Sequence, residues 1–521
     1  MKKILAVLVV FAFIFTFLVG CNETVDVESG DESVAEQSAE SKDLQADSGD
    51  ESDDESGDES DDASVESEPE ELKMSDYFAE VFAGNASSKI YCIDNIEQLY
   101  NFVYLVNEKG IDFEGDVVLL REDIELNPTD NIEDWGDNPP ENVWEPIGTK
   151  TPFKGRFIGG SAEKVGGAIY SYKTELKEIS GIYCAGDKNK NTIGLFANIE
   201  GALIENIKLG KGKLYGENEE SFISAAGIVV NAVDSEIICC VNYADVASAF
   251  AAGIVFDAEN SEVIWSDNYG SISSENGSSA GIANRIKGGE IYGCSNYGTI
   301  NGTDAAGIAC GQGRSVIRCC VNKGSVTAKC YGGGILGYSS YDSGASVLAS
   351  CANYGEILSG ETAGGIIGSV WEEQSSLWVM DVLNVGNVTV AYEEDVLTDD
   401  HSQPDDQDRF AGGIVGKVVL CSVDGLGDFR LDGALNLGQV TASGNHSAII
   451  GNEGARDYLV DLCDNCFYLD TTVEKSVIGK AVKKSKLTDE KTLDGLLDGM
   501  NWEMDEELGH PILARDHVSV D

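Results

Sequence analysis

Residues suited to acid–base catalysis are scarce in this sequence of 521 residues. It contains four histidines, none of them in a His-Glu-x-x-His zinc motif: His401, His446, His510 and His517. The chain also lacks the Gly-x-Ser-x-Gly turn of serine hydrolases and the glycine-rich loop that cradles phosphates. We therefore expect a protein that is not an enzyme and has no catalytic residues.

Carboxylates are the chemically active side chains that the sequence has in excess. Clustered carboxylates cleave polysaccharides, one protonating a sugar oxygen while another activates water. Arg285-Ile286-Lys287 resembles a short element of pectin-cleaving hydrolases. Its companion carboxylate and Gly-His-Gly elements are missing, so we interpret the match as coincidence. A polysaccharide lyase or glycoside hydrolase, with carboxylates converging from separate segments, remains the first alternative function.

The charge balance restricts the partners of the chain. It has 91 Asp and Glu residues against 35 Lys and Arg, a formal net charge of −56. Nucleic acids and anionic lipid surfaces need clustered cations, so neither is an expected partner. No acidic segment has the ligand spacing of an EF-hand. We expect no cofactor and no bound metal beyond a weak association with calcium.

Seven Gly-Ile pairs, each followed by an Asn-x-Gly or a near match, divide the chain into repeats. The first four glycines, Gly227, Gly253, Gly281 and Gly307, are separated by 26, 28 and 26 residues. The later ones are Gly334, Gly365 and Gly413. Two markers that keep step through seven units indicate a repeat architecture. The units are rich in Val, Ile, Tyr and Ser, and none carries a long helical apolar period.

A period near 26 residues fits one coil of a parallel β-helix, with about three short strands stacked on the next coil at ~4.8 Å. We predict an all-β parallel β-helix solenoid with short helical caps at both ends, the first at 94–107 and the second near Leu487–Leu497. Equivalent residues then lie above one another, so the repeated asparagines should form an internal hydrogen-bonded ladder that satisfies buried turns. These are Asn242, Asn268, Asn296, Asn322, Asn353, Asn384 and Asn436.

Cysteines recur two residues before the asparagines, at Cys240, Cys294, Cys320 and Cys351, with Cys463 aligned to Asn465. Residues two apart share one face of a strand, so these thiols should form an inward column. Metal binding is the alternative. The single Cys-x-x-Cys, Cys463 to Cys466, has no second pair nearby to complete a tetrahedral site. A local disulfide there is left open.

The residue that follows each asparagine is the candidate for ligand contact. Tyrosine occupies this position four times, at Tyr243, Tyr269, Tyr297 and Tyr354, and Lys323 interrupts the series. If the asparagines point inward, these rings point outward as a strip against which a glycan lies. The structural alternative is that the rings only cover the turns.

The segments Gly-Gly-Ile-Ile-Gly368 and Gly-Gly-Ile-Val-Gly416, each followed by an Asn-x-Gly-x-Val, resemble the GLUG repeat of bacterial surface proteins. Trp144-Glu-Pro-Ile-Gly148 and the tail around Gly509-His-Pro-Ile-Leu513 resemble segments that flank such repeats. The resemblance spans roughly residues 88–515 and implies an exported β-helix of the kind found in adhesins. Several units have Ala-Gly-Ile where the family prefers Gly-Gly.

The N-terminus predicts export. Lys2 and Lys3 precede an apolar run, Ile4 to Val19, that is too short for a stable transmembrane helix. The run ends in Leu18-Val19-Gly20-Cys21, which resembles the lipobox of bacterial lipoproteins. The resemblance implies cleavage before Cys21 and acyl chains on its thiol, which anchor the chain in a membrane.

Five segments follow from these patterns. Residues 1–20 are a lipoprotein signal peptide, and 21–72 are the lipidated cysteine and a disordered acidic linker without aromatic residues. Residues 73–224 hold the cap helix and irregular coils, 225–470 the GLUG-like repeats, and 471–521 a capping segment. An acidic insert, Glu393 to Asp408, interrupts the repeats and is interpreted as a solvated loop.

The sequence thus favours a non-catalytic, membrane-anchored lipoprotein exposed at the cell surface or in the cell envelope. We expect a monomer that binds a glycan or a surface protein through its β-helix. The second alternative is a passive surface spacer.

Overall fold

The structure is a computed structural model that describes residues 72–513. Gaps fall at 86, 187–189, 217–221, 340–343, 373–374, 392–407, 421–428, 454–456, 474–475, 490, 494–495 and 497–500. The predicted signal peptide, Cys21, nearly all of the linker and nearly all of the acidic insert lie outside the described residues. No helix in the described part reaches the length and hydropathy of a bilayer-spanning segment.

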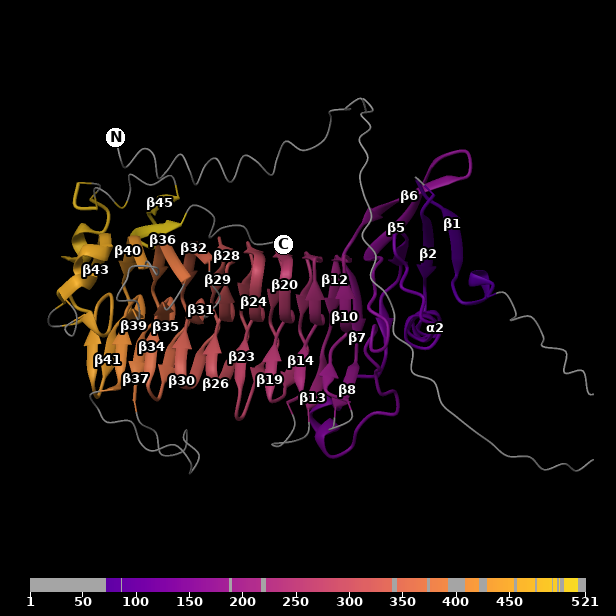
Figure 1. Ribbon diagram of the computed structural model, residues 1–521, viewed down its shortest axis with the longest axis horizontal. Coiled ribbons are helices and arrows are strands. Elements are labelled where there is room, and N and C mark those ends of the chain that lie inside the picture. The colour runs from indigo at the N-terminus through magenta and orange to yellow at the C-terminus, as the bar shows by residue number, and fades with distance from the viewer. Residues whose placement is uncertain are drawn as a thin grey trace, which may run out of the picture. The chain divides into compact units, whose positions relative to one another are not determined.

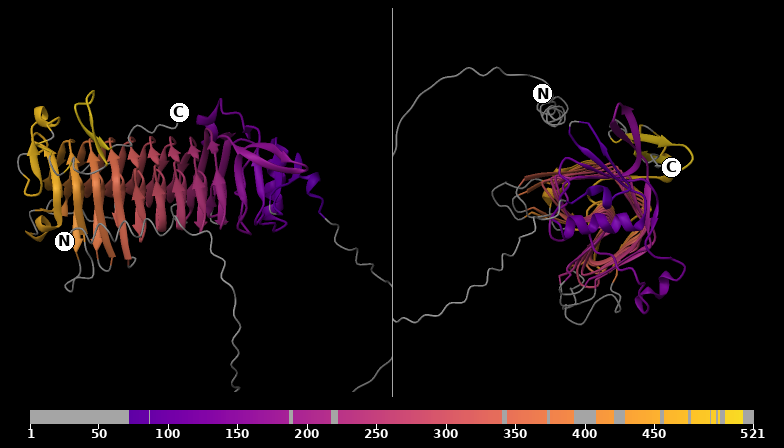
Figure 2. Two further views of the ribbon diagram at one scale, coloured as in Figure 1. Left: turned by 90° about the horizontal axis from the view of Figure 1, so that it is seen from above. Right: turned by 90° about the vertical axis from the view of Figure 1, so that its right-hand side faces the viewer.

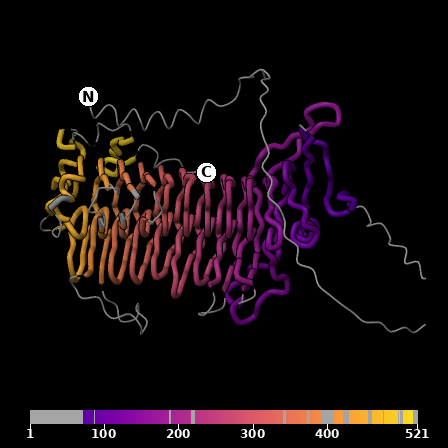
Figure 3. Tube along the Cα trace, viewed as in Figure 1, coloured from indigo at the N-terminus to yellow at the C-terminus, as the bar shows by residue number. Residues whose placement is uncertain are grey.

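The repeats form a parallel β-helix, as predicted (Figure 1). One regular coil contains β20 (Val255–Ile264), β21 (Asp267–Asn268), β22 (Ile272–Ser273) and β23 (Ser278–Ala280). Each strand pairs in parallel with its counterpart in the next coil; β20 pairs with β24 (Ala283–Tyr292) from Val255↔Ala283 to Ile264↔Tyr292. The chain traces these coils one beside the next (Figure 3).

Strands at equivalent positions of successive coils stack into files. The file of β22 also contains β18 (Asp245–Ala247), β33 (Ile357–Ser359) and β37 (Val388–Val390), and three other files stand beside it. The first file is β15 (Val229–Val233), β20, β24, β27 (Ala309–Gly313), β31 (Leu336–Ser339), β35 (Ile367–Glu372) and β39 (Val415–Leu420). The second ends on the repeated asparagines: β17 (Val241–Asn242), β21, β25 (Ser295–Asn296), β29 (Val321–Asn322), β32 (Gly344–Asn353), β36 (Ser375–Asn384) and β40 (Phe429–Asn436). The third belongs to the other long sheet and includes β14 (Ser224–Ala226), β19 (Phe250–Ala252), β23, β26 (Ile300–Ala306), β30 (Val326–Gly333), β34 (Thr362–Gly364) and β38 (Phe410–Gly412).

The predicted asparagine ladder is present and continuous. Each amide Nδ2 donates to the Oδ1 of the asparagine in the next coil, from Asn242 to Asn436, at 2.8–2.9 Å. The same Nδ2 also donates to the backbone carbonyl two residues later, as Asn296 does to Gly298 O at 2.9 Å. All seven side chains are fully buried. The ladder therefore satisfies polar groups that would otherwise be buried without partners.

The glycine of each Gly-Ile pair packs directly on this ladder. A Cβ added to Gly281 would lie 2.1 Å from Gly307 O and 2.5 Å from Asn296 Cγ. Gly227, Gly253, Gly307, Gly334, Gly365 and Gly413 meet equivalent atoms. No side chain fits at these positions. The Gly-Ile and Asn-x-Gly markers recur together because their glycine and asparagine are in contact.

The N-terminal end is closed by α2 (Ile96–Asn107), which lies across the end of the coils (Figure 2). Leu99 is fully buried, and Phe102 packs against Phe153 and Phe157 at centroid distances of 5.6 Å. The helix begins with two reciprocal bonds: Asn95 Oδ1 accepts from Gln98 N, and Gln98 Oε1 accepts from Asp94 N. Asparagine and glutamine thus make the capping box here.

The C-terminal region differs from the helix expected over Leu487–Leu497, where the described residues form turns. Among the residues described in this region, the 3-10 turns η5 (Asp457–Leu462) and η6 (Lys484–Lys486) are present. An antiparallel hairpin, β45 (Trp502–Asp505) and β46 (His510–Leu513), lies beside β36. Trp502 Nε1 donates to Asp381 Oδ1 at 2.9 Å, which ties the hairpin to the coils.

The inward cysteine column is also present, with one correction. Cys240, Cys294, Cys320 and Cys351 are fully buried and linked by contacts such as Ser266 N to Cys294 Sγ at 3.4 Å. The alignment of Cys463 with this column is wrong. Cys466 pairs with Ala434, and Tyr468 takes the place of a ladder asparagine beside Asn436.

Replacing one ladder asparagine tests this description of the core. Asn296→Ala removes two donated hydrogen bonds and one accepted bond, which leaves buried polar groups of two neighbouring coils without partners. We expect a loss of roughly 2–4 kcal/mol in the free energy of unfolding, measured by chemical denaturation. Asn301→Ala, on an exposed position of the same repeat, is the control and should cost less than about 0.5 kcal/mol. Equal costs for the two variants would contradict the ladder.

Candidate functional site

The candidate site is a pocket of about 350 Å³ on the outer surface of the first strand file. Two columns of outward side chains line it. The register places Asp257, Arg285, Gly311 and Tyr338 in one column, and Glu259, Lys287 and Gly313 in the other. The residues between them, Ala258 and Ile286, point into the core. The pocket is therefore assembled from four successive coils.

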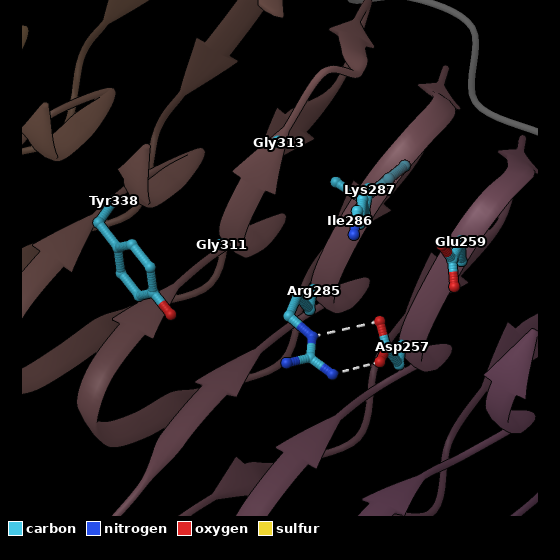
Figure 4. Close-up of a pocket in the computed structure, with 8 residues that line it drawn as sticks. All are labelled: Asp257, Glu259, Arg285, Ile286, Lys287, Gly311, Gly313 and Tyr338. Atoms are coloured by element: carbon cyan, nitrogen blue, oxygen red, sulfur yellow. Dashed lines mark hydrogen bonds and ion pairs between the residues drawn. The ribbon is translucent and has the colours of Figure 1, made fainter. Parts of the chain in front are cut away.

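The pocket exists because β27 has glycine at both outward positions. Gly311 and Gly313 supply a floor without side chains, between Arg285 and Lys287 of β24 on one side and Tyr338 of β31 on the other (Figure 4). A Cβ added at Gly311 would meet only the tip of the Tyr338 ring, at 3.3 Å. The tyrosine ring thus reaches over the glycine floor and forms a wall of the pocket.

Arg285 is held by a two-pronged ion pair. Its Nε lies 3.2 Å from Asp257 Oδ1, and its Nη2 contacts Asp257 Oδ2 (Figure 4). The arginine side chain is 59% exposed, so this pair adds little stability but fixes the orientation of both groups. The lining contains two acidic and two basic residues, which gives the pocket no formal net charge.

The chemistry of this lining suits a neutral, hydroxyl-rich molecule. Carboxylates accept and guanidinium and ammonium groups donate, and each can serve several hydroxyls at once. Tyr338 adds an aromatic wall and a hydroxyl. The formal charge of the chain, −56, disfavours the approach of anions. Within the described residues, no three His, Cys, Asp or Glu side chains are grouped to hold a metal ion.

The structure brings three of the four predicted tyrosines together. The rings of Tyr243, Tyr269 and Tyr297 are stacked nearly parallel, with centroids 4.6 and 4.5 Å apart. Lys208 Nζ and Lys323 Nζ lie over the outer rings, each 5.1 Å from a centroid. The ring faces are thus occupied by one another and by the two ammonium groups. A glycan at this stack would meet ring edges and hydroxyls.

Tyr354 does not extend the stack. Lys323 lies between it and Tyr297 along the coils, and Tyr354 packs, with Val385 and Leu437, against the cluster that contains Trp502 and Leu513. This part of the flank is covered by the C-terminal hairpin, so Tyr354 is a packing residue. Glycan contact at the other three tyrosines stays a prediction.

The Cys240 thiol of the cysteine column offers little reactivity. Burial raises the pKa of the Cys240 thiol to about 12, so it stays protonated at neutral pH. Cys463 and Cys466 are free, as are the other cysteines of the described residues. The column therefore acts as apolar filling between coils.

A buried carboxylate that the sequence did not predict lies at a register shift within the long sheet that contains the third file. Asp304 is on β26, where the pairing with β30 shifts register. Its Oδ1 is buried and has no hydrogen-bond partner within the described residues. Burial, reinforced by the Glu361 carboxylate, raises the pKa of Asp304 to about 6, although the Tyr331 backbone N–H opposes the rise.

The raised pKa of Asp304 predicts a pH-dependent loss of stability. Its folded-state pKa of about 6 exceeds the ordinary value of 3.8, so the carboxylate destabilises the fold increasingly as pH rises from about 4 to 6. Asp304→Asn should raise the free energy of unfolding by roughly 1–3 kcal/mol at pH 7.5 and change it little at pH 4. Thermal unfolding at both pH values measures this. The exposed control Asp130→Asn should show no such difference, and a pH-independent effect of Asp304→Asn would contradict the assignment.

Comparisons with known proteins add no function. No family model and no curated protein matches the sequence, so the resemblance to GLUG repeats stays a prediction. Among solved structures, the chain is similar to a "putative immunoglobulin A1 protease" from Bacteroides ovatus, with a TM-score of 0.36 and 14% identity over 84% of this chain and 96% of that chain. A TM-score this low supports no transfer of activity or substrate.

Proposed function

We propose that this protein is a non-catalytic, exported lipoprotein that binds a neutral saccharide in the pocket between Asp257 and Tyr338. The observation that carries the proposal is the glycine floor of β27, which opens a polar hollow beside an oriented Arg285–Asp257 pair and an aromatic wall. Ligand sites of this kind combine a preformed concavity with a few fixed polar groups.

Attachment at a surface is the second part of the proposal and rests on the sequence. The lipobox-like Leu18-Val19-Gly20-Cys21 would place acyl chains on Cys21, and the acidic segment that follows would act as a tether. The GLUG-like repeats favour a role in adhesion. A saccharide of the host, of a neighbouring cell or of the cell wall fits this position.

The enzyme alternative receives less support from this pocket. A glycoside hydrolase needs one carboxyl group as acid and a second as base or nucleophile. Two carboxylates line the pocket, but Asp257 is engaged on both oxygens by Arg285. The absence of soluble sugar released from bound polymer would separate binding from cleavage.

Binding in the pocket is tested by two substitutions and a matched control. Arg285→Ala removes the oriented donor, and Gly311→Val fills the floor, where only the tip of Tyr338 must move. We expect each to weaken binding at least tenfold in affinity electrophoresis through gels that contain β-glucan, galactomannan or arabinoxylan. Arg318→Ala is the control, because Arg318 also pairs with a carboxylate, Glu290, and lies 4.4 Å over a ring, Tyr292, outside the pocket.

Three outcomes bear on the proposal. Retention of binding by both pocket variants would contradict it, as would binding to none of the three polymers. Loss of binding in Tyr297→Ala, but not in Arg285→Ala, would move the site to the tyrosine stack.

Lipid attachment is tested separately. Expressed in a bacterium with a lipoprotein pathway, the full chain should incorporate labelled palmitate and fractionate with membranes, because two or more acyl chains anchor firmly. Cys21→Ala should abolish both properties. Labelling that persists in the variant would show that the lipid is elsewhere or that the N-terminus has another role.

A further inference from the structure

A row of aromatic side chains runs into the pocket from the earlier coils. Phe222 and Phe250 stack with centroids 6.1 Å apart and planes within 13°, and Phe250 and Phe256 lie a further 6.1 Å apart. Phe222 is 82% exposed. We call these three residues the phenylalanine row.

Arg285 joins the row to the pocket. Its guanidinium carbon lies 6.0 Å from the Phe256 ring centroid, while the same group pairs with Asp257 and lines the pocket. Strand pairing places Ser224 beside Phe250, and Ser224 is two residues after Phe222. It also places Asp257 beside Arg285, and Asp257 directly follows Phe256. Row and pocket therefore form one track that advances from coil to coil, and between Phe250 on β19 and Phe256 on β20 it passes from the second long sheet to the first.

Aromatic residues also follow on the other side of the pocket. Tyr331 and Trp371 make an edge-to-face contact at 6.3 Å. Tyr331 lies in the file that contains Phe250, as the pairing Ser278↔Asp304↔Tyr331 shows. Trp371, on β35, thus places a ring one coil beyond Tyr338, and Tyr331 contacts it from the other long sheet.

The row differs from the tyrosine stack in a way that points to a ligand. Lysines cover both ends of the tyrosine stack, so its ring faces are used up within the fold. Phe222 stacks on Phe250 with one face and leaves most of its surface in solvent. A phenylalanine exposed to this degree contributes little to the stability of the fold, because little of its ring is buried. Exposed apolar groups rimmed by polar ones typify binding surfaces.

We infer that the ligand is a saccharide chain rather than a single sugar, and that it lies along the track with one unit in the pocket and further units on the phenylalanine row. This inference rests on the proposed function. A neutral glycan has both apolar ring faces and hydroxyl groups, and the track offers aromatic rings for the faces and a polar pocket for the hydroxyls. The absence of formal net charge in the pocket lining gives no preference for an anionic polymer.

The dependence of affinity on chain length tests the inference. Gluco-, manno- and xylo-oligosaccharides of one to six units are titrated by calorimetry into the full chain and its variants. For the series that binds, affinity should rise at least tenfold from one unit to the longest. Phe222→Ala and Phe250→Ala should remove most of this rise and leave the affinity for the shortest binding member unchanged.

The controls separate this inference from the proposed function. Trp265→Ala, another exposed aromatic residue in the described part of the chain, should leave the length dependence intact. Arg285→Ala should weaken short and long ligands alike. Binding of short ligands with no effect of either phenylalanine substitution would overturn the track but preserve the pocket. Failure of all three series to bind would overturn both. Phe222 is so exposed that its removal leaves folding intact, which keeps the result interpretable.

Discussion

The contact between the glycine of each Gly-Ile pair and the asparagine amide of the same repeat governs this molecule. Each Gly-Ile glycine lies against a ladder asparagine and a backbone carbonyl of the next repeat, with no room for a Cβ. Each asparagine in turn bonds to the next asparagine and to its own turn, as Asn268 does to Asn296 and Gly270. A shift of one residue in any coil would break all of these contacts, so the register is tightly fixed.

This fixed interior leaves the outer positions free to vary. Outward columns hold side chains as different as Asp257, Arg285, Gly311 and Tyr338 at one strand spacing from each other. Such a column can bring donors, acceptors and rings from several coils to one place without disturbing the core. The pocket is a local consequence: two glycines in β27 remove side chains where the neighbouring coils keep theirs.

The coil architecture and the ladder were predictable because both markers recur in step and sit in direct contact. The packing of Tyr354 could not be predicted, because it depends on the C-terminal hairpin that covers this flank. Trp502 holds the hairpin in place through Asp381, which is 121 residues away in the sequence. The pocket could not be predicted because it depends on two glycines that lie between larger side chains of the neighbouring coils. Sequence spacing gives the strand register that brings these residues together only approximately. Cys463 was misaligned because its coil lacks the ladder asparagine, and Tyr468 takes that place.

A crystal structure of the mature chain with a bound neutral oligosaccharide tests the central claim most directly. The account predicts sugar density over Gly311 and Gly313, within hydrogen-bonding distance of Arg285, and continuing toward Phe256 and Phe250. Density confined to the stack of Tyr243, Tyr269 and Tyr297, with an empty glycine floor, would contradict it.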